Sequence, residues 1–288
     1  MKPKFELFIG SLTRHSKKEQ EHMLEDANRE IRTKRFETIK VSISPNLIDK
    51  ELLKMLKKYK VSTVELEVQS MNDYILRKCG YTYTKEEIKK ATKMIKWNRL
   101  NVSFQIGVGL PDSTRIDELN TAKELAKLRP NAVRIYPMVV MKNTELVEEY
   151  KKERYEPLTL NQAIERCKEV IYELNRRHIK RISIVKQNEL NKSAETEVIA
   201  GPYHNDFGQL VSDSIWYDSI VDKIKKFNVK VKKVKIEVNP KELPNIIGYE
   251  SENANKLKEF YDVDIKAEGN PEIKIGKSNI TILEVYSN

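Results

Sequence analysis

The chain has 288 residues and a formal net charge of +10, from 53 Lys and Arg residues against 43 Asp and Glu residues. The length predicts one large domain, or a medium domain followed by a small one. Hydrophobic residues at 39% and charged residues at 33% are typical of a soluble globular protein, and no run approaches the roughly 18 apolar residues of a membrane span. The composition therefore excludes a membrane-spanning protein, and the lack of a signal peptide predicts a cytoplasmic one.

The two cysteines, Cys79 and Cys167, limit the chemistry of the chain. Two thiols are too few for a disulfide scaffold or for a structural zinc site with three or four thiolates. An iron–sulfur cluster, which several thiolates normally hold, needs more ligands than this chain has. We therefore expect no cofactor in this chain.

Roughly the first two-thirds of the chain alternates between apolar β-branched runs and amphipathic helical runs. Strands that alternate with helices imply right-handed crossovers and a parallel sheet or barrel, so we expect the α/β class. Strands are predicted over 5–9, 38–43, 63–68, 101–108, 132–136 and 181–185, and helices over 17–32, 49–58, 85–97, 116–128 and 160–176.

From about residue 228 the elements become shorter. The pattern predicts a strand, two helices, a strand and a β-hairpin, over 229–238, 240–247, 252–261, 263–266 and 273–285. This order is typical of a small α+β domain. We predict a larger domain over 1–211, a linker over 212–227 and the small domain over 228–288.

In parallel α/β folds the functional site lies at the carboxyl ends of the strands. If a cofactor pocket survives there, the residues just after the strands should line it. They are Gly10, Ser11, Gln69, Gly109 and Gln187.

Three further residues are candidates for contact with a substrate or ligand. Arg134 and Tyr136 lie at the end of the predicted strand 132–136. Arg134 fits a carboxylate or phosphate bidentately, and it fits a structural ion pair equally well. His204 stands in an aromatic segment, where it is either a substrate contact or a packed loop residue.

The segment 223–235 holds seven lysines and no acid. One interpretation is attraction for nucleic acid, and the other is a solvated strand edge that lysines protect from aggregation. The lysines that we select as nucleic-acid contacts are Lys230, Lys232, Lys233 and Lys235.

Short motifs over the first 210 residues or so resemble the radical S-adenosylmethionine (SAM) superfamily, in the branch of the Elongator catalytic subunit and its bacterial relatives. Six motifs in the family's order carry the resemblance. They are Phe8-Ile-Gly-Ser-Leu-Thr13, Val64-Glu-Leu-Glu-Val-Gln-Ser70, Gln105-Ile-Gly-Val-Gly-Leu-Pro111, Val133-Arg-Ile-Tyr-Pro137, Tyr155-Glu-Pro-Leu158 and Ile199-Ala-Gly-Pro-Tyr-His204.

The resemblance implies a (β/α) barrel, a 4Fe–4S cluster and S-adenosylmethionine. The family's CxxxCxxC motif is absent, and the first motif looks like the family's second strand, so we expect a partial barrel that lacks its first strand. Glu67 and Val185 stand where the family has glycines, and side chains at these positions should fill space that the cofactor needs. We therefore expect no catalytic residues and no metal site.

The segment 238–265 resembles a KH domain. In KH domains an Ile-Gly-x-x-Gly loop joins two helices and clamps about four nucleotides. The corresponding loop here runs from Gly248 to Ser251, and we select these two residues as nucleic-acid contacts. Glu250 and Glu252 weaken the resemblance in binding, because they put negative charge where phosphates would lie.

Three hypotheses for function follow. The first is a degenerate radical-SAM-like protein without its own cluster, which binds RNA of the tRNA type or a protein partner and is not catalytic. The second is a tRNA-modifying radical SAM enzyme whose cluster segment comes from another chain or an upstream segment. The third is a small-ligand enzyme on the residual barrel. The missing strand also predicts that another chain or a further segment covers the sheet edge at Phe5.

Overall fold

The computed structural model describes residues 6–33, 35–187 and 197–286. The chain forms two compact units. The first comprises 1–159, 169–185 and 191–202, and the second comprises 160–168, 186–190 and 203–288.

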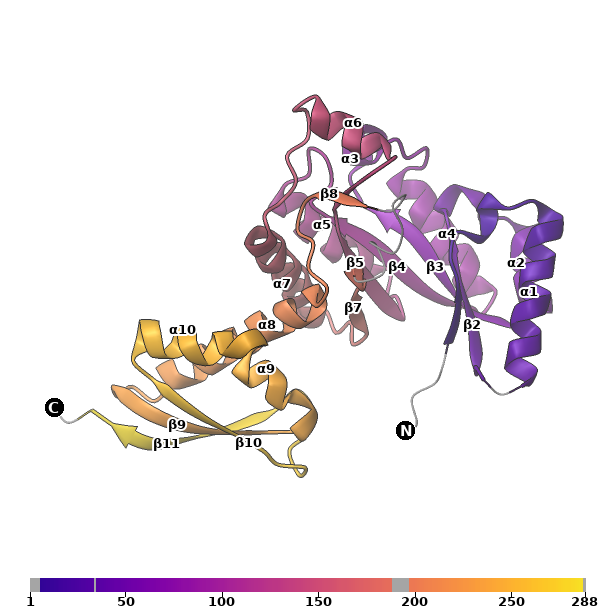
Figure 1. Cartoon of the computed structure of the whole chain (residues 1–288). Helices are drawn as coiled ribbons and strands as arrows, with labels where there is room; N and C mark the ends of the chain where they lie inside the picture. Colours follow the sequence, from indigo (N-terminus) through magenta and orange to yellow (C-terminus); the bar gives the residue numbers. More distant parts are fainter. Residues whose placement is uncertain (1–5, 34, 188–196, 287–288) are drawn as a thin grey trace. The chain divides into compact units, whose positions relative to one another are not determined.

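The first unit is built on a six-stranded sheet in which every neighbouring pair is parallel (Figure 1). The spatial order is the order of the chain, and the carboxyl ends of all six strands lie at one edge. This arrangement confirms the predicted α/β class with a parallel sheet. The strands are β1 (Glu6–Ile9), β2 (Thr38–Ile43), β3 (Val61–Gln69), β4 (Asn101–Val108), β5 (Ala132–Pro137) and β7 (Ile182–Ile184).

Helices connect these strands, and capping side chains fix where several of them begin. Ser16 and Thr84 each form a capping box with a glutamate three residues later, so the free N–H groups of the first turn are satisfied. The helices are α1 (Lys17–Arg32), α2 (Lys50–Lys58), α3 (Asp73–Lys78), α4 (Lys85–Trp97), α5 (Arg115–Lys127), α6 (Glu145–Lys151) and α7 (Leu160–Arg176). A short pair, β6 (Val140–Met141) and β8 (Val198–Ala200), is antiparallel.

The two faces of the six-stranded sheet differ in polarity. Successive side chains of a strand point to opposite faces. One face carries apolar side chains without exposed surface, such as Val41, Leu66, Phe104 and Ile135. The residues between them are polar, so the sheet has one apolar face and one polar face.

The second unit is a three-stranded mixed sheet with helices packed on it. The central strand β9 (Val231–Val238) pairs in parallel with β10 (Asp264–Gly269) and antiparallel with β11 (Ser278–Val285). Three helices complete this unit: α8 (Phe207–Lys225), α9 (Leu243–Ile247) and α10 (Glu252–Tyr261).

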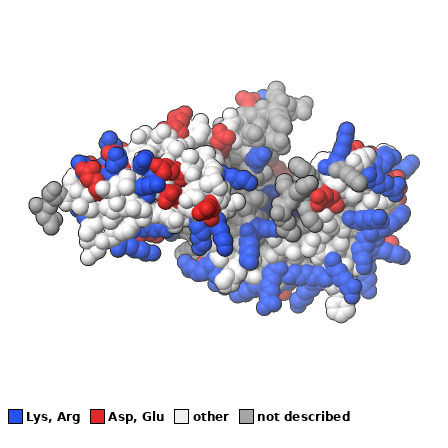
Figure 2. Space-filling view, turned by 90° about the horizontal axis from the view of Figure 1, so that it is seen from below, with Lys and Arg blue, Asp and Glu red and all other residues white. Residues whose placement is uncertain are grey.

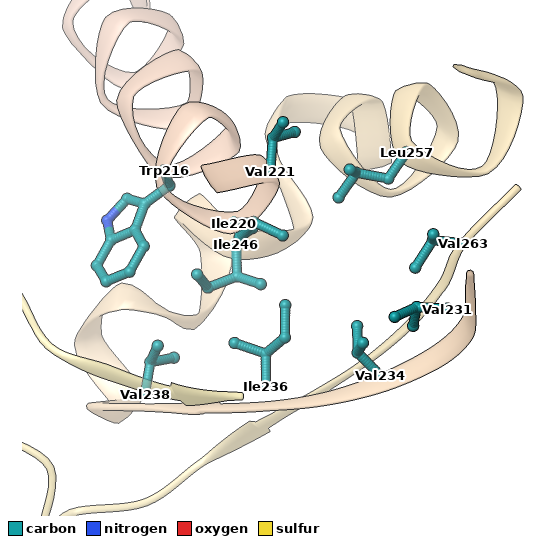
Figure 3. Packing of buried hydrophobic residues seen from close by; sticks show 10 residues of the cluster. All are labelled: Trp216, Ile220, Val221, Val231, Val234, Ile236, Val238, Ile246, Leu257 and Val263. Atoms are coloured by element: carbon teal, nitrogen blue, oxygen red, sulfur yellow. The ribbon is translucent and has the colours of Figure 1, made fainter. Parts of the chain in front are cut away.

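Apolar side chains from α8, α9, α10 and the sheet form a core in the second unit (Figure 3). Trp216 and Ile220 of α8 and Ile236 of β9 belong to this buried core. The helices and strands together make the predicted small α+β fold.

Two predictions for this part differ from the structure. The β-hairpin predicted over 273–285 is wrong, because that segment holds one strand, β11, which pairs with β9 and not with a neighbour in sequence. Ile273 is buried in the loop before β11 and gave a strand-like signal. Residues 212–227, predicted as a linker, lie mostly in α8, because its apolar side chains supply part of the core. In the described part of the chain, no helix combines the length and apolar character needed to cross a membrane.

Candidate functional site

The candidate site is the polar face of the six-stranded sheet. The register aligns Ser42 with Glu65, Glu65 with Ser103, Glu67 with Gln105, and Gln105 with Arg134 across neighbouring strands. Because β2, β3, β4 and β5 lie side by side, their polar side chains meet on one surface. The residues of this polar face are Lys40, Ser42, Glu65, Glu67, Ser103, Gln105, Arg134 and Tyr136.

Glu67 accepts three serine hydroxyls on this face. Ser42 Oγ donates to Glu67 Oε1 at 2.8 Å, and Ser11 Oγ donates to the same oxygen at 3.3 Å. Ser44 Oγ donates to the other oxygen, Oε2, at 3.1 Å. Hydrogen bonds from three directions fix the carboxylate in one orientation. Glu67, which the sequence presents as a side chain that fills a space, is therefore the centre of a polar cluster.

Glu65 is the centre of a second cluster and has no exposed surface. Its Oε2 pairs with Lys40, lies 3.5 Å from Arg134 Nε and accepts from Ser103 Oγ at 3.3 Å. Its Oε1 is buried without a hydrogen-bond partner among the described residues. A buried carboxylate is tolerated only when it is paired, so Lys40 and Arg134 are needed to hold it.

Phe8 of β1 lies beside the two cations of this cluster. Its ring centre is 5.6 Å from Lys40 Nζ and 4.7 Å from Arg134 Cζ, which is the range of cation–π attraction. Arg134 also donates to Tyr136 Oη at 3.2 Å, and burial is the main reason that the pKa of Tyr136 is raised. Both predicted ligand contacts on β5 are thus engaged by neighbouring side chains, which agrees with the structural interpretation of Arg134.

Four of the five predicted cofactor-binding residues belong to the first unit, and only Ser11 contacts Glu67. Gly109 has φ 82°, its N–H donates to Glu118 Oε1 at 2.6 Å, and its carbonyl accepts from Tyr155 Oη at 2.7 Å. A Cβ at Gly109 would lie 2.9 Å from the Leu158 side chain. The space beside this glycine is therefore filled by the chain itself. Gly10 is exposed, and Gln69 is buried at the end of β3.

A pocket of about 690 Å³ lies where the loops after β3 and β4 meet α6. Cys79, Leu110, Met138 and Tyr155 are among its lining residues. The pKa of the Cys79 thiol is raised to about 11, mainly by burial and then by the charge of Asp112. Sequence reasoning missed this pocket, because it predicted neither α3 nor α6, and side chains of both helices line it.

The other predicted residues lie in the second unit. Gln187 Oε1 accepts the backbone N–H of His204 at 2.9 Å, while Gln187 Nε2 is buried without a partner in the described structure. His204 Nδ1 accepts from the Asp206 N–H at 3.1 Å, and the His204 ring lies edge-on to Tyr249 with centres 5.2 Å apart. These contacts are typical of a packed loop histidine.

The loop from Gly248 to Ser251 is tied to α8. The Tyr249 N–H donates to Asp213 Oδ2 at 2.8 Å, and burial raises the pKa of Asp213. Gly248 has φ 80°, and a Cβ there would lie 2.8 Å from the Asn253 backbone nitrogen. An N–H group that a bound phosphate could use is therefore already paired with a carboxylate of the same chain.

The selected lysines of β9 and the residue before it stand among acids and an aromatic ring. Lys232 pairs with Glu284 at 2.5 Å, and Lys235 pairs with Glu268 at 2.9 Å. Lys230 lies over the ring of Tyr286, and Lys233 is exposed. Because acids lie beside these lysines, the positive electrostatic potential at this strand is weaker than the seven lysines of 223–235 alone would produce. Nucleic-acid binding by these residues stays a prediction.

Two family models match the chain. The Radical SAM superfamily matches residues 3–125, and the Radical_SAM C-terminal domain matches residues 130–216. A tRNA uridine(34) acetyltransferase of Methanocaldococcus jannaschii is 36% identical over 120 residues, which are 41% of this chain and 22% of that protein. A protein of the same name from Methanocaldococcus infernus is 35% identical over 120 residues, with the same shares of 41% and 22%. The chain thus spans about a fifth of the length of these curated relatives.

A solved archaeal structure has a similar fold. The archaeal Elp3 of Methanocaldococcus infernus, with residues 1–46 deleted, has a TM-score of 0.59 and 22% identity. The match covers 77% of this chain and 55% of that one.

The expectation that this chain has no cofactor is wrong. The match to the Radical SAM superfamily implies S-adenosylmethionine and a 4Fe–4S cluster. The number of cysteines shows only whether this chain can supply the thiolates that hold a cluster. It therefore could not exclude that a cluster or S-adenosylmethionine binds.

The residues that the structure describes do not fit the cluster itself. Among 6–33, 35–187 and 197–286, no three His, Cys, Asp or Glu side chains are arranged to hold a metal ion. The thiol of Cys79, with its raised pKa, is a poor thiolate donor. No catalytic step through a cluster is therefore derived from these residues.

The parallel six-stranded sheet, its polar face and the two family matches agree with one another. The matched segments together cover most of the chain, from residue 3 to residue 216. The chain belongs to the radical SAM superfamily.

Proposed function

We propose that this chain binds tRNA and takes part in tRNA modification as a member of the radical SAM superfamily. The observation that carries the proposal is the 36% identity over 120 residues to a protein named tRNA uridine(34) acetyltransferase. The chain corresponds to 22% of that protein, so acetyl transfer is not part of the proposal. A tRNA partner also fits the cytoplasmic location that we expect.

The charge of the chain supports a nucleic-acid partner. A net charge of +10 attracts the phosphates of a nucleic acid, whose condensed cations the Lys and Arg side chains replace. Binding through phosphates releases those counterions, so affinity should fall steeply as salt rises.

The test measures the fluorescence anisotropy of a labelled tRNA transcript titrated with the full chain, at about 50 and 200 mM salt. We expect saturable binding at low salt, a marked loss at high salt, and weaker binding of a DNA duplex with the same number of phosphates. If tRNA does not bind at low salt, or if duplex DNA binds equally well, the proposal fails.

Two forms of this function differ in whether the chain takes part in chemistry. In the first form the chain only binds tRNA or a protein partner, and the polar face is structural. Support comes from Glu65 and Glu67, whose carboxylates are engaged by Lys40, Arg134 and serine hydroxyls of the same chain. In the second form, another chain or segment holds the cluster of a tRNA-modifying enzyme, and superfamily membership supports it.

S-adenosylmethionine binding separates the two forms. A ligand that binds the folded chain raises its melting temperature. A rise with S-adenosylmethionine, together with iron and sulfide retained after anaerobic reconstitution beside a partner, supports the second form. No rise and no retained iron support the first. The third hypothesis, a small-ligand enzyme, loses its main support because Arg134 is held by Glu65 and Tyr136.

We also propose a protein partner at the outer edge of β1. Among the described strands only β2 pairs with β1, and Phe8 is 41% exposed. An unpaired strand edge attracts further strands. Residues 1–5, which include Phe5, lie outside the described residues.

A further inference from the structure

The amino-terminal edge of the six-stranded sheet is strongly basic. Here we name as the amino-edge surface the turns 57–60, 96–99, 127–131 and 176–181. Each of them joins a helix to the next strand of the sheet, and together they hold eleven Lys and Arg residues and no Asp or Glu. The strands that they enter, β3, β4, β5 and β7, are consecutive neighbours. The four turns therefore lie side by side at the edge opposite to the carboxyl ends of the strands.

Figure 2 views the molecule from this side. In Figure 1 the strands of the first unit run upward, so a view from below meets their amino-terminal ends. Lys and Arg side chains crowd the first unit, on the right of Figure 2, with few acids among them. Direct contacts join two of the turns: Lys96 Nζ donates to the carbonyls of Leu128 at 2.6 Å and Arg129 at 2.8 Å.

The favourable interaction of cations with helix C-termini accounts for only part of this charge. Lysines and arginines in the last turn of a helix complement the helix dipole, as Lys57 and Lys127 do. Lys60, Arg99 and Arg129 lie beyond the helix ends, are exposed, and have no ion pair in the described structure. Burial, and then the charge of Arg129, lower the pKa of Lys96. Other cations of the amino-edge surface are paired, Lys127 with Glu124 and both Arg176 and Arg177 with Glu173, so the charge available to a partner lies at Lys60, Arg99 and Arg129.

The backbone of these turns is a second, independent observation. Each turn has one residue in the left-handed conformation, at the position after a helix where glycine is usual. The four residues are Lys60 (φ 56°), Arg99 (φ 61°), Arg129 (φ 50°) and His178 (φ 64°). A side chain at positive φ is strained where glycine would be relaxed. Lys60, Arg99 and Arg129 thus stand at positions where a side chain carries a conformational cost.

Trp97 lies within this surface and is 90% exposed. Burial of large aromatic rings is strongly favourable, so a tryptophan left in water among cations indicates a partner with flat rings and negative charge. Unpaired bases stack on aromatic side chains while basic residues hold the phosphates. An acidic peptide or an anionic membrane would use the cations but offers no base to stack on Trp97.

We propose that the amino-edge surface binds RNA, with Lys60, Arg99 and Arg129 on phosphates and Trp97 stacked on an unpaired base. The inference rests on the proposed tRNA function and adds where the contact is made. It places the RNA contact at the sheet edge opposite to the strand ends that carry the candidate site. The surface thus contributes affinity for RNA and no chemistry.

The test compares two double variants of the full chain in the tRNA anisotropy assay. Lys60→Gln with Arg99→Gln removes two charges from the amino-edge surface. Lys50→Gln with Lys85→Gln removes two exposed charges from the first turns of the same helices, α2 and α4, at their other ends. The slope of log affinity against log salt is negative. We expect the first variant to make it less steep by about 0.9 for each lost phosphate contact, and the second variant to leave it unchanged.

Trp97 supplies a readout of its own. The chain has two tryptophans, and the other, Trp216, is buried. We expect tRNA to quench the tryptophan emission of the wild-type chain but not of Trp97→Ala, and the variant to lose affinity roughly five-fold or more. Its melting temperature should not change, because the ring makes little contact with the protein.

The outcomes distinguish failure of the amino-edge surface from failure of the proposed tRNA binding. If tRNA binds but both double variants behave alike, or if Trp97→Ala binds as tightly as the wild type, the amino-edge surface is overturned while the tRNA proposal stands. If tRNA does not bind at all, both fail. If phosphatidylserine vesicles or a poly-glutamate peptide bind with the same sensitivity to Lys60→Gln and Arg99→Gln and tRNA does not, the RNA inference is overturned in favour of that partner.

Discussion

At the scale of single residues, the polar face depends on pairing inside the sheet. Glu65 has no exposed surface, and Lys40 and Arg134 are the cations that compensate it. Removal of one partner of a buried ion pair leaves an uncompensated charge, which is far more costly than the loss of an exposed pair.

We predict that Lys40→Met lowers the free energy of unfolding by about 3–5 kcal/mol, measured by urea denaturation. The matched control is Lys89→Met, which breaks the exposed pair with Glu86 and should have little effect. The double variant Lys40→Met with Glu65→Gln should recover part of the loss, because the fully buried Glu65 side chain is then uncharged, while Arg134 keeps some contact with solvent. Equal losses in Lys40→Met and Lys89→Met would contradict the role of the buried pair.

Single residues also show which contacts could not be predicted from the sequence. Ser11 is selected from the sequence as a residue that lines a surviving cofactor pocket; in the structure its hydroxyl donates to Glu67, and the cofactor contact stays a prediction. Glu67 is taken as a side chain that fills a space, and the three hydroxyls that it accepts are not foreseen. Ser42 and Ser44 are 25 and 23 residues away in sequence, so only the register of β2 against β3 brings them to Glu67.

At the scale of elements, local signals predict the helices and strands with clear boundaries. The bounds of α1, α4, β4 and α7 agree with the sequence analysis, because caps and apolar periodicity mark them. Helix α8 is missed because apolar residues surround it on several sides, so no single face stands out. The partner of β11 depends on which edge of β9 is free, and no local pattern carries that information.

The connection between α9 and α10 gives a prediction at this scale. Gly248 and Gly276 have nearly the same φ, 80° and 79°, but a Cβ at Gly248 would meet Asn253 at 2.8 Å while a Cβ at Gly276 meets nothing within 4 Å. We predict that Gly276→Ala costs about 1–2 kcal/mol from backbone strain alone and that Gly248→Ala costs distinctly more. The measurement is the thermal transition of Trp216 emission, and equal shifts would contradict the crowding at Gly248.

At the scale of the whole molecule, the chain divides into two compact units, and the second has a buried core to which α8 contributes. The units interleave along the chain, so their bounds differ from the predicted 1–211, 212–227 and 228–288. Units with their own cores unfold separately unless a large apolar interface joins them. We predict two transitions in the Trp97→Phe variant. Trp216 emission should follow the second unit, and far-ultraviolet circular dichroism should follow both. Superimposable transitions by both probes would instead indicate one cooperative unit.

The chain order of the strands has a consequence for how the protein folds. In the first unit each strand from β2 to β5 pairs with the strand made just before it, so the sheet can grow on the ribosome as the chain emerges. Contacts between near neighbours in sequence also favour rapid folding. In the second unit the central strand β9 is made before both of its partners, β10 and β11. The backbone N–H and C=O groups at both edges of β9 must therefore wait for these later strands, so this sheet cannot grow strand by strand as the first one can.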